Sequence, residues 1–533
     1  MYNSENHHVC YYTKIKKFNL ILMKKLFVIL LSIAALAGSY TYGNCKVGET
    51  DKNHQYQCDS ITAKIINEGT TNNQTMKHLD ILCNRFGGRL LGSDSYTNAA
   101  EWCAYMFKKW GVEVIQEEAG ELPVGFNRGP WFGRMIGGNG MVLHFATPSY
   151  TSGTKGVQRG HVLREPKTTR EFERIKGALK GAWVLIDGES TGWPIDYTPT
   201  GDSLRAKIIA ENDNIVARNE EAYYYNRKIR QERGELKKQM LANPKEKGKL
   251  QKKLDALKER EIEKTKEIPA LFYKEMREAG MIGIIQSAPV PITALYDRKN
   301  VEKMTFETLP EIPDIKLDED QFRTIAAMVD RREYFQLEFD IRNHFKMGPV
   351  KFYNIIGMIR GSEYPDEYVM AGGHLDAFDV ATGGVDCGVG ATVSLEAARL
   401  LAVAGAKPKR SILFCLWAGE EYGLWGSKFF VEHNSEKMPN ISNYINRDGG
   451  PTVPLGITVT PATYNDFVKV CEPVNLINKE FPFTVKKRVG EPQPKPVNAG
   501  AGGSDHAPFM VYGVPTFSFS TGDPKGYNFS YGA

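Results

Sequence analysis

The sequence predicts an α/β protein, built on a largely parallel, mixed sheet flanked by helices, with a β-rich domain inserted into it. From about residue 350 onward, strand-like apolar runs alternate with amphipathic helical patterns, which is typical of a parallel sheet. Residues 126–340 instead contain short β-rich runs punctuated by Gly and Pro. The 533 residues also exceed what a single hydrophobic core usually holds, so more than one domain is expected.

The N-terminal segment 1–37 has the pattern of a leader. Lys24 and Lys25 form a basic start, and residues 26–37 form an apolar stretch that ends in small residues. This stretch is too short to span a bilayer, which needs about 20 apolar residues. We therefore predict a signal peptide at 23–37, no membrane anchor after its removal, and a secreted or periplasmic mature protein.

Residues 55–125 are expected to form the first part of the main domain. Two helical patterns between residues 75 and 111 are followed by the strand-like run VEVIQEE. The main domain resumes at 345–533, after the β-rich domain at 126–340. Within the latter, the charged stretch 204–267 is predicted to be a helical hairpin divided at Pro244.

The net charge of +5 has a local origin, because residues 218–266 contain 16 Lys/Arg against nine Asp/Glu. This mixed-charge segment does not form a basic patch with stacking aromatic residues, so nucleic acid is not expected as a partner. Eight cysteines are too few for a disulfide scaffold. Cys45 with Cys58, or Cys83 with Cys103, could pair, and the sequence leaves both pairings open.

Strands predicted in residues 345–533 end in acids or histidine. The residues at these ends are His374, Asp376, Glu420, Glu421 and Asp448, and Asp386 lies between the first of these strands and the helix that follows it. The carboxyl ends of parallel strands meet at one edge of a sheet, so these side chains should converge there. Taken singly, each has an ordinary structural explanation, such as a helix cap or a turn.

Several carboxylates beside one imidazole repel one another unless a cation lies between them. Imidazole and carboxylate ligands suit Zn²⁺ or similar metals, and two ions that share a carboxylate can activate water for hydrolysis. Glu420 and Glu421 are adjacent on a run expected to stay extended through both residues. Neighbours on an extended backbone point to opposite sides, so one can bind metal while the other faces substrate.

The ordered motifs GGHLDAFD, GGVDCGVGA, LWAGEEYGLWGS, NRDGG and GSDHAPF resemble those of the M28 family of zinc metallopeptidases. GGRLLGSDSY at 87–96 resembles an N-terminal motif of the same family. The inserted region resembles a protease-associated (PA) domain. Within the family, the motifs are most similar to the carboxypeptidase Q branch. The resemblance implies a zinc exopeptidase fold for most of the mature chain.

The resemblance implies a role for each strand-end residue. His374, Asp386, Glu421 and Asp448 match metal ligands, with Asp386 bridging two zinc ions. Asp376 matches the aspartate that orients the histidine, and Glu420 matches the general base.

Two departures from the family pattern stand out. Cys387 follows Asp386 where the family often has Asn or Asp, and we expect a neutral, packed thiol there. The family's last histidine ligand lies near the C-terminus, and His506 matches a wall of the site rather than that ligand. We therefore expect the sequence to be incomplete at its C-terminus.

The expected function is that of a secreted zinc exopeptidase that removes N-terminal residues from peptides. A carboxypeptidase Q-like dipeptidase and a non-catalytic, receptor-like or metal-deficient binding protein remain the alternatives. Peptides or dipeptides are the expected partners, and the question of a homodimer stays open.

Overall fold

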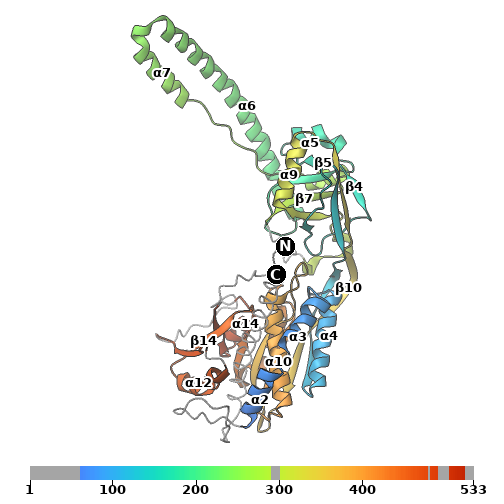
Figure 1. Cartoon of the computed structure of the whole chain (residues 1–533). Helices are drawn as coiled ribbons and strands as arrows, with labels where there is room; N and C mark the ends of the chain where they lie inside the picture. The colour runs from blue at the N-terminus through green and yellow to red at the C-terminus, as the bar shows by residue number, and fades with distance from the viewer. Residues whose placement is uncertain (1–59, 290–300, 478–479, 490–502, 523–533) are drawn as a thin grey trace, which may run out of the picture. The chain divides into compact units, whose positions relative to one another are not determined.

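The computed structural model describes residues 60–289, 301–477, 480–489 and 503–522 (Figure 1). The predicted signal peptide, together with Cys45 and Cys58, lies outside these residues. The chain divides into two compact units. Among the described residues, the first contains 60–127, 301–306 and those from 345 onward, and the second contains 128–289 and 307–344. Within the described residues, no helix combines the length and apolar character needed to cross a bilayer.

The first unit is built on a six-stranded mixed sheet in the order β1-β10-β12-β11-β13-β16. β10 pairs antiparallel with β12, whereas β11 runs parallel to both β12 and β13, and β13 runs parallel to β16. This confirms the predicted α/β class with a largely parallel, mixed sheet. The strands are β1 (Glu113–Asn127), β10 (His344–Ile359), β11 (Tyr364–His374), β12 (Arg410–Trp417), β13 (Ile441–Asn446) and β16 (Thr516–Phe517).

Apolar helices and strand faces enclose the sheet of this unit. Helix α10 is buried at every residue from Val389 to Leu401, because an apolar helix with small Ala and Gly residues can pack closely on the sheet. α11 and α14 pack on a core with β12 and β13 that includes Trp417, Phe430 and Phe509. The helices are α2 (Ser60–Thr71), α3 (Thr75–Asp80), α4 (Asp94–Lys109), α10 (Val389–Val403), α11 (Trp425–His433), α12 (Tyr464–Cys471), α13 (Val474–Ile477) and α14 (His506–Val511).

The C-terminal run VPTFSFST has the alternating pattern of a single strand, but the structure divides it between two sheets. Thr516–Phe517 form β16 in the main sheet, and Phe519–Gly522 form β17, which pairs antiparallel with β14 (Val453–Val459). β14 also pairs with β15 (Thr484–Lys487), completing a three-stranded sheet. The period-two pattern of the run predicts extended backbone and cannot show that its partner changes at Ser518.

The second unit contains a five-stranded sheet in the order β3-β8-β7-β6-β5 and a three-stranded antiparallel sheet in the order β2-β9-β4. A core around Trp183 and Phe339 joins strands of both sheets. Its elements are β2 (Trp131–Gly137), β3 (Phe145–Ala146), β4 (Gln158–Gly160), β5 (Val162–Arg164), α5 (Thr169–Ile175), β6 (Trp183–Glu189), α6 (Pro199–Ala242), α7 (Lys247–Glu259), α8 (Tyr273–Glu278), β7 (Gly283–Ala288), β8 (Asp314–Asp318), α9 (Glu319–Asp330) and β9 (Phe335–Ile341).

Helices α6 and α7 form an arm that projects from the strands of this unit (Figure 1). The helices meet at Pro244, which begins a short 3-10 turn between them. The extended segment after α7 then lies along α6, held by three asparagines spaced seven residues apart on that helix. Each asparagine donates to and accepts from the backbone of this returning segment, in the pairs Asn212–Ile268, Asn219–Thr265 and Asn226–Ile262.

Candidate metal centre

The side chains at the strand ends meet at one edge of the main sheet. His374 is the last residue of β11, which lies between β12 and β13 and runs parallel to both. Glu420 and Glu421 follow the end of β12, and Asp448 follows the end of β13. Parallel neighbours bring their carboxyl ends to the same edge, so residues from three strands are placed around His374.

The imidazole of His374 is fully buried, and its two nitrogens face different groups. Nδ1 lies 2.9 Å from the backbone oxygen of Asp376, an arrangement in which Nδ1–H donates and Nε2 is left for another partner. Nε2 lies 3.0 Å from Oδ1 of Asp386, 3.3 Å from Oδ1 of Asp448 and 4.0 Å from Oε2 of Glu420. Three carboxyl groups from separate segments therefore converge on one nitrogen.

The carboxylate of Asp376 holds the turn that carries the two glutamates. Its Oδ1 accepts the backbone N–H of Glu420 at 3.1 Å, and its Oδ2 accepts that of Glu421 at 3.2 Å. Oδ1 lies 3.5 Å from Nδ1 of His374, farther than the backbone oxygen of the same residue. Asp376 thus contacts the histidine and the glutamate turn together.

The expectation that the strand extends through Glu421 is wrong. β12 ends at Trp417, and Gly419 has a φ of 67°, which turns the chain before the glutamates. Glu420 and Glu421 therefore lie in a turn, and their directions are set by the bonds to Asp376 rather than by strand alternation. An apolar run ending in Ala-Gly does not reveal where the strand stops, because glycine adopts this conformation without steric cost.

Burial and mutual repulsion shift the acid–base behaviour of the cluster. Burial raises the pKa of Glu420 to about 9; the charge of His374 opposes this shift, and those of Asp505 and Asp448 add to it. Burial would also raise the pKa of Asp448, but its contact with the imidazole of His374 lowers it to about 2. The neighbouring carboxylates of this cluster repel one another when they are charged. A bound cation would offset that repulsion.

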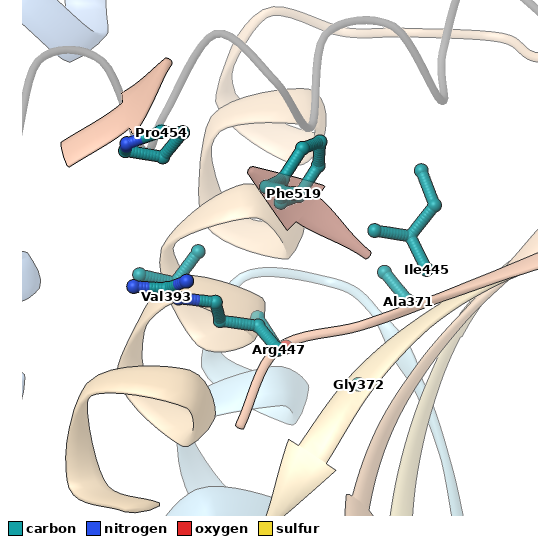
Figure 2. A pocket seen from close by; sticks show the side chains of 8 residues that line it. Ala371, Gly372, Val393, Ile445, Arg447, Pro454 and Phe519 are labelled. Carbon is teal, nitrogen blue, oxygen red and sulfur yellow. The ribbon is translucent and has the colours of Figure 1, made fainter. Parts of the chain in front are cut away.

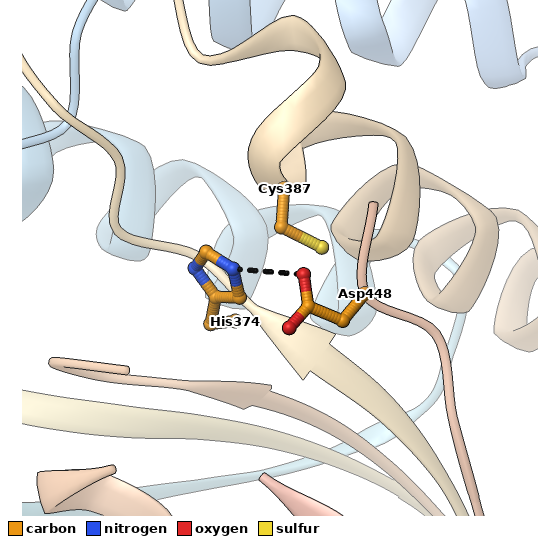
Figure 3. A group of neighbouring side chains, drawn as sticks. All are labelled: His374, Cys387 and Asp448. Atoms are coloured by element: carbon orange, nitrogen blue, oxygen red, sulfur yellow. Dashed lines mark ion pairs between the residues drawn. The ribbon is translucent and has the colours of Figure 1, made fainter. Parts of the chain in front are cut away.

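The described residues contain two groups of possible metal ligands, and the ligand atoms within each group lie within 4.8 Å of one another. His374 belongs to both groups. One contains Cys387 and Asp448 (Figure 3), and the other contains Glu420 and Glu421. Nitrogen and carboxylate donors in such groups fit Zn²⁺. Cys387 is fully buried, its Sγ lies 3.3 Å from the backbone oxygen of Arg447, and burial raises the pKa of its thiol. This setting agrees with a packed, neutral thiol.

Arg89, in the motif GGRLLGSDSY, was not singled out as a site residue, yet it braces the loops of the cluster. Its guanidinium is fully buried and donates to the backbone oxygens of Leu375 at 2.7 Å, Thr382 at 3.0 Å and Gly383 at 2.8 Å. These carbonyls flank the loops that present His374 and Asp386. The available signal in the sequence was an arginine directly after two glycines, within the motif GGRLLGSDSY.

Residues of the GSDHAPF motif lie behind the cluster. Ser504 Oγ accepts a hydrogen bond from Nδ2 of Asn446 at 2.7 Å, and His506 Nδ1 lies 3.5 Å from the same nitrogen. Asp505 is fully buried and accepts a hydrogen bond from Ser427 at 2.6 Å. Burial raises its pKa to about 7. The motif is therefore bonded to β13 and α11 outside the ligand cluster.

A small cavity of this unit is lined by Ala371, Gly372, Val393, Ser394, Ile445, Arg447, Pro454 and Phe519 (Figure 2). It contains none of the candidate ligands, although Arg447 directly precedes Asp448. The Arg447 guanidinium makes long bonds, of 3.3 and 3.4 Å, to the backbone and hydroxyl oxygens of Thr452. The ligand cluster, rather than this cavity, defines the candidate site.

The strand-end cluster presents the nitrogen and carboxylate donors of a metal site. Residues 354–531 match Peptidase family M28. Carboxypeptidase Q of Xenopus laevis is 30% identical over 208 residues, 37% of this chain and 44% of that protein. The glutamate carboxypeptidase 2 homolog of Caenorhabditis elegans is 32% identical over 206 residues, 34% of this chain and 26% of that protein. The chain thus spans less than half the length of these curated relatives.

Among solved structures, a peptidase M28 precursor from Shewanella amazonensis has a TM-score of 0.49 at 18% identity, covering 87% of this chain and 88% of that one. A zinc aminopeptidase from Bacillus subtilis has a TM-score of 0.45 at 16% identity, covering 86% of each chain. The family match over residues 354–531 and the curated relatives show that this part of the chain is similar to peptidases of family M28.

Proposed function

We propose that the protein is a secreted, zinc-dependent exopeptidase that cleaves peptides with a water molecule activated at a two-metal site. The observation that carries this proposal is the convergence of Asp386, Asp448 and Glu420 on Nε2 of His374. The apolar leader at 23–37 supports secretion, and the family match supports peptide hydrolysis.

His374, Asp386, Glu421 and Asp448 would hold the metal. Zinc in such a site lowers the pKa of a bound water and polarises a carbonyl group. Glu420 lies beside the ligands without being required as one, and it would take a proton from the water and deliver it to the leaving amine. Asp376 would keep Glu420 and Glu421 in place through their backbone amides.

Two substrate classes follow from this proposal. The first is the release of N-terminal residues, which requires recognition of a free α-amine. The second is hydrolysis of dipeptides in the manner of carboxypeptidase Q, which the 30% identity over 208 residues favours. Aminoacyl-nitroanilides and N-blocked dipeptides separate the two, because the first class needs the free amine and the second needs the free carboxylate.

The deciding experiment combines zinc content with the variant Glu420→Gln. We expect near-stoichiometric zinc, about two ions per chain, in both wild type and variant, and peptide hydrolysis in the wild type alone. Glu432→Gln, at an exposed position on α11, is the matched control and should retain activity. Full activity of Glu420→Gln would refute its role as the base. Wild-type protein that takes up no zinc would refute the enzyme proposal and favour a binding protein.

A further inference from the structure

The glutamate turn, residues 418–426, carries Glu420 and Glu421 on a backbone that needs support from outside. Three of its residues have left-handed φ values, 67° at Gly419, 106° at Gly423 and 66° at Leu424. Glycine adopts such values without steric cost, whereas a leucine in this conformation is strained. A turn of this kind persists only where surrounding groups determine its course.

The two ends of the glutamate turn meet at Ala418 and Gly426. The N–H of Gly426 donates to the backbone oxygen of Ala418 at 2.8 Å. Asn354 on β10, whose side chain is fully buried, bonds to both ends. Its Oδ1 accepts the N–H of Ala418 at 3.1 Å, and its Nδ2 donates to the backbone oxygen of Gly426 at 2.9 Å. Asn354 therefore holds the ends of the turn, while Asp376 holds its middle.

The partners of Asn354 require an amide at this position. A backbone N–H can only donate and a carbonyl can only accept, so the bonds to Ala418 and Gly426 fix which way the amide faces. The second N–H of Nδ2 donates to Oε2 of Glu117 on β1 at 2.8 Å. Oε1 of Glu117 accepts from Nδ2 of Asn434, directly after α11, at 3.0 Å. An aspartate in place of Asn354 would lack both N–H donors.

Gly426 leaves no room for a side chain beside Asn354. A Cβ at Gly426 would lie 2.1 Å from Oδ1 of Asn354 and 2.6 Å from the backbone oxygen of Ala418. Both distances are shorter than real contacts of a Cβ atom, so a methyl group would have to displace the amide or separate the ends of the turn. The contact can therefore be disturbed from either partner.

We propose that Asn354 is a positioning residue for Glu420. By holding both ends of the glutamate turn, it keeps the Glu420 carboxylate beside His374, where Oε2 lies 4.0 Å from Nε2. This inference rests on the proposed function, since it takes Glu420 as the base. A residue that only stabilises the fold would lower stability without separating kcat from KM. A positioning residue instead lowers kcat, whereas KM and zinc content stay close to those of the wild type.

The test exchanges donor and acceptor between Asn354 and Glu117. Asn354→Asp keeps the acceptor for Ala418 but places one carboxylate against another, and kcat should fall about a hundredfold, the scale of a misplacement of roughly 1 Å. Adding Glu117→Gln supplies an NH₂ that donates to the new carboxylate, while its oxygen still accepts from Asn434. The double variant should recover kcat by about tenfold, although Glu117→Gln alone should lower it.

Hydrogen exchange in the chelator-treated protein gives a readout that does not depend on activity. The amides of Glu420 and Gly426 should exchange about tenfold faster in Asn354→Asp and return toward the wild-type rate in the double variant. Gly426→Ala should accelerate exchange at Glu420 and lower kcat as well, because it disturbs the same contact from the other side. It carries the same test if Asn354→Asp does not fold.

Asn443→Ala is the matched control, because Asn443 is a buried asparagine on another strand of the same sheet. It should lower thermal stability and leave kcat unchanged. A wild-type kcat in Asn354→Asp, or no recovery when Glu117→Gln is added, would overturn the positioning role and leave the proposed function standing. A wild-type protein that neither binds zinc nor hydrolyses peptides would overturn the proposed function and this inference together.

Discussion

Asp376 accepts the backbone amides of both Glu420 and Glu421, at 3.1 and 3.2 Å, through its two carboxylate oxygens. One carboxylate therefore fixes two consecutive residues to which we assign different roles: Glu420 is the proposed base and Glu421 a proposed metal ligand. Asp376 lies two residues after His374, and the backbone oxygen of Asp376 contacts Nδ1 of His374. Two of the strand ends that form the site are joined through this single residue.

Asp376→Asn should impair catalysis more than folding. Asparagine keeps one acceptor oxygen but turns an NH₂ toward the second amide, which leaves a buried N–H without its partner and costs about 1–3 kcal/mol locally. We expect kcat to fall by about ten- to a hundredfold, with a smaller change in melting temperature. Asp366→Asn, at an exposed position near the start of β11, is the control and should change neither quantity. A kcat equal to that of the control would contradict the bracing role.

Cys387 is expected to remain a neutral thiol when metal binds. Its Sγ contacts the backbone oxygen of Arg447, and burial raises its pKa. The cobalt-substituted protein should therefore lack the near-ultraviolet charge-transfer band of a thiolate ligand, and Cys387→Ala should bind the same amount of zinc. A strong band that disappears in Cys387→Ala would instead identify the cysteine as a ligand and would favour soft metals at the site.

Glu165, in the second unit, should make stability depend on pH. Burial raises its pKa from 4.5 to about 7, against the opposing effect of hydrogen bonds from the backbone amides of Asp187 and Leu271. Above pH 4.5 the unfolded chain releases this proton while the folded protein still holds it. Stability should consequently fall as pH rises from 4.5 to 7, by on the order of 3 kcal/mol, and stay level above.

The variant Glu165→Gln isolates this contribution. It should be less stable in absolute terms, because its NH₂ faces one of the two backbone amides. The difference in unfolding free energy between wild type and variant should nevertheless shrink steadily between pH 4.5 and 7. Chemical denaturation followed at several pH values measures this difference, and a difference that does not change with pH would show that Glu165 ionises normally.

The arm of the second unit offers a separate test of side-chain to backbone bonding. Asn226 exchanges two hydrogen bonds with Ile262, at 2.7 and 2.9 Å. Asn226→Ala should accelerate hydrogen exchange at the Ile262 amide and trypsin cleavage after Lys264, since the returning segment loses one of its attachments. Asn214→Ala, on the exposed face of the same helix, should leave both rates unchanged. Unaltered exchange at Ile262 would show that the other two asparagines suffice.

The sequence predicted the class of fold and the convergence of His374 with Asp386, Glu420 and Asp448, because period-two and helical patterns locate the strand ends. It failed where backbone geometry decides the outcome. The strand before Glu420 ends at Trp417, and the run around Ser518 changes sheets. Neither event alters the hydrophobic pattern from which strands are read.

Support for the site was also beyond sequence reasoning. Tyr444 and Asn446 lie in the pattern of an ordinary alternating strand. Asn446 donates a hydrogen bond to Ser504, which is 58 residues away along the chain. Their connection depends on tertiary contacts that no local pattern encodes. Arg89 was visible as part of a motif, but the carbonyls it contacts belong to loops almost 300 residues away, as its bond to Gly383 at a separation of 294 residues shows.

The three asparagines of α6 that bond to the returning segment restrict how the length of the arm can change during evolution. Seven helical residues advance about 10.5 Å, and three extended residues advance about 10 Å, so the two spacings stay in step. An insertion in α6 between Asn212 and Asn226 alone would move the asparagines out of step with their partners. This part of the arm can therefore change length only in coupled steps, with seven residues in the helix for every three in the segment between Ile262 and Ile268.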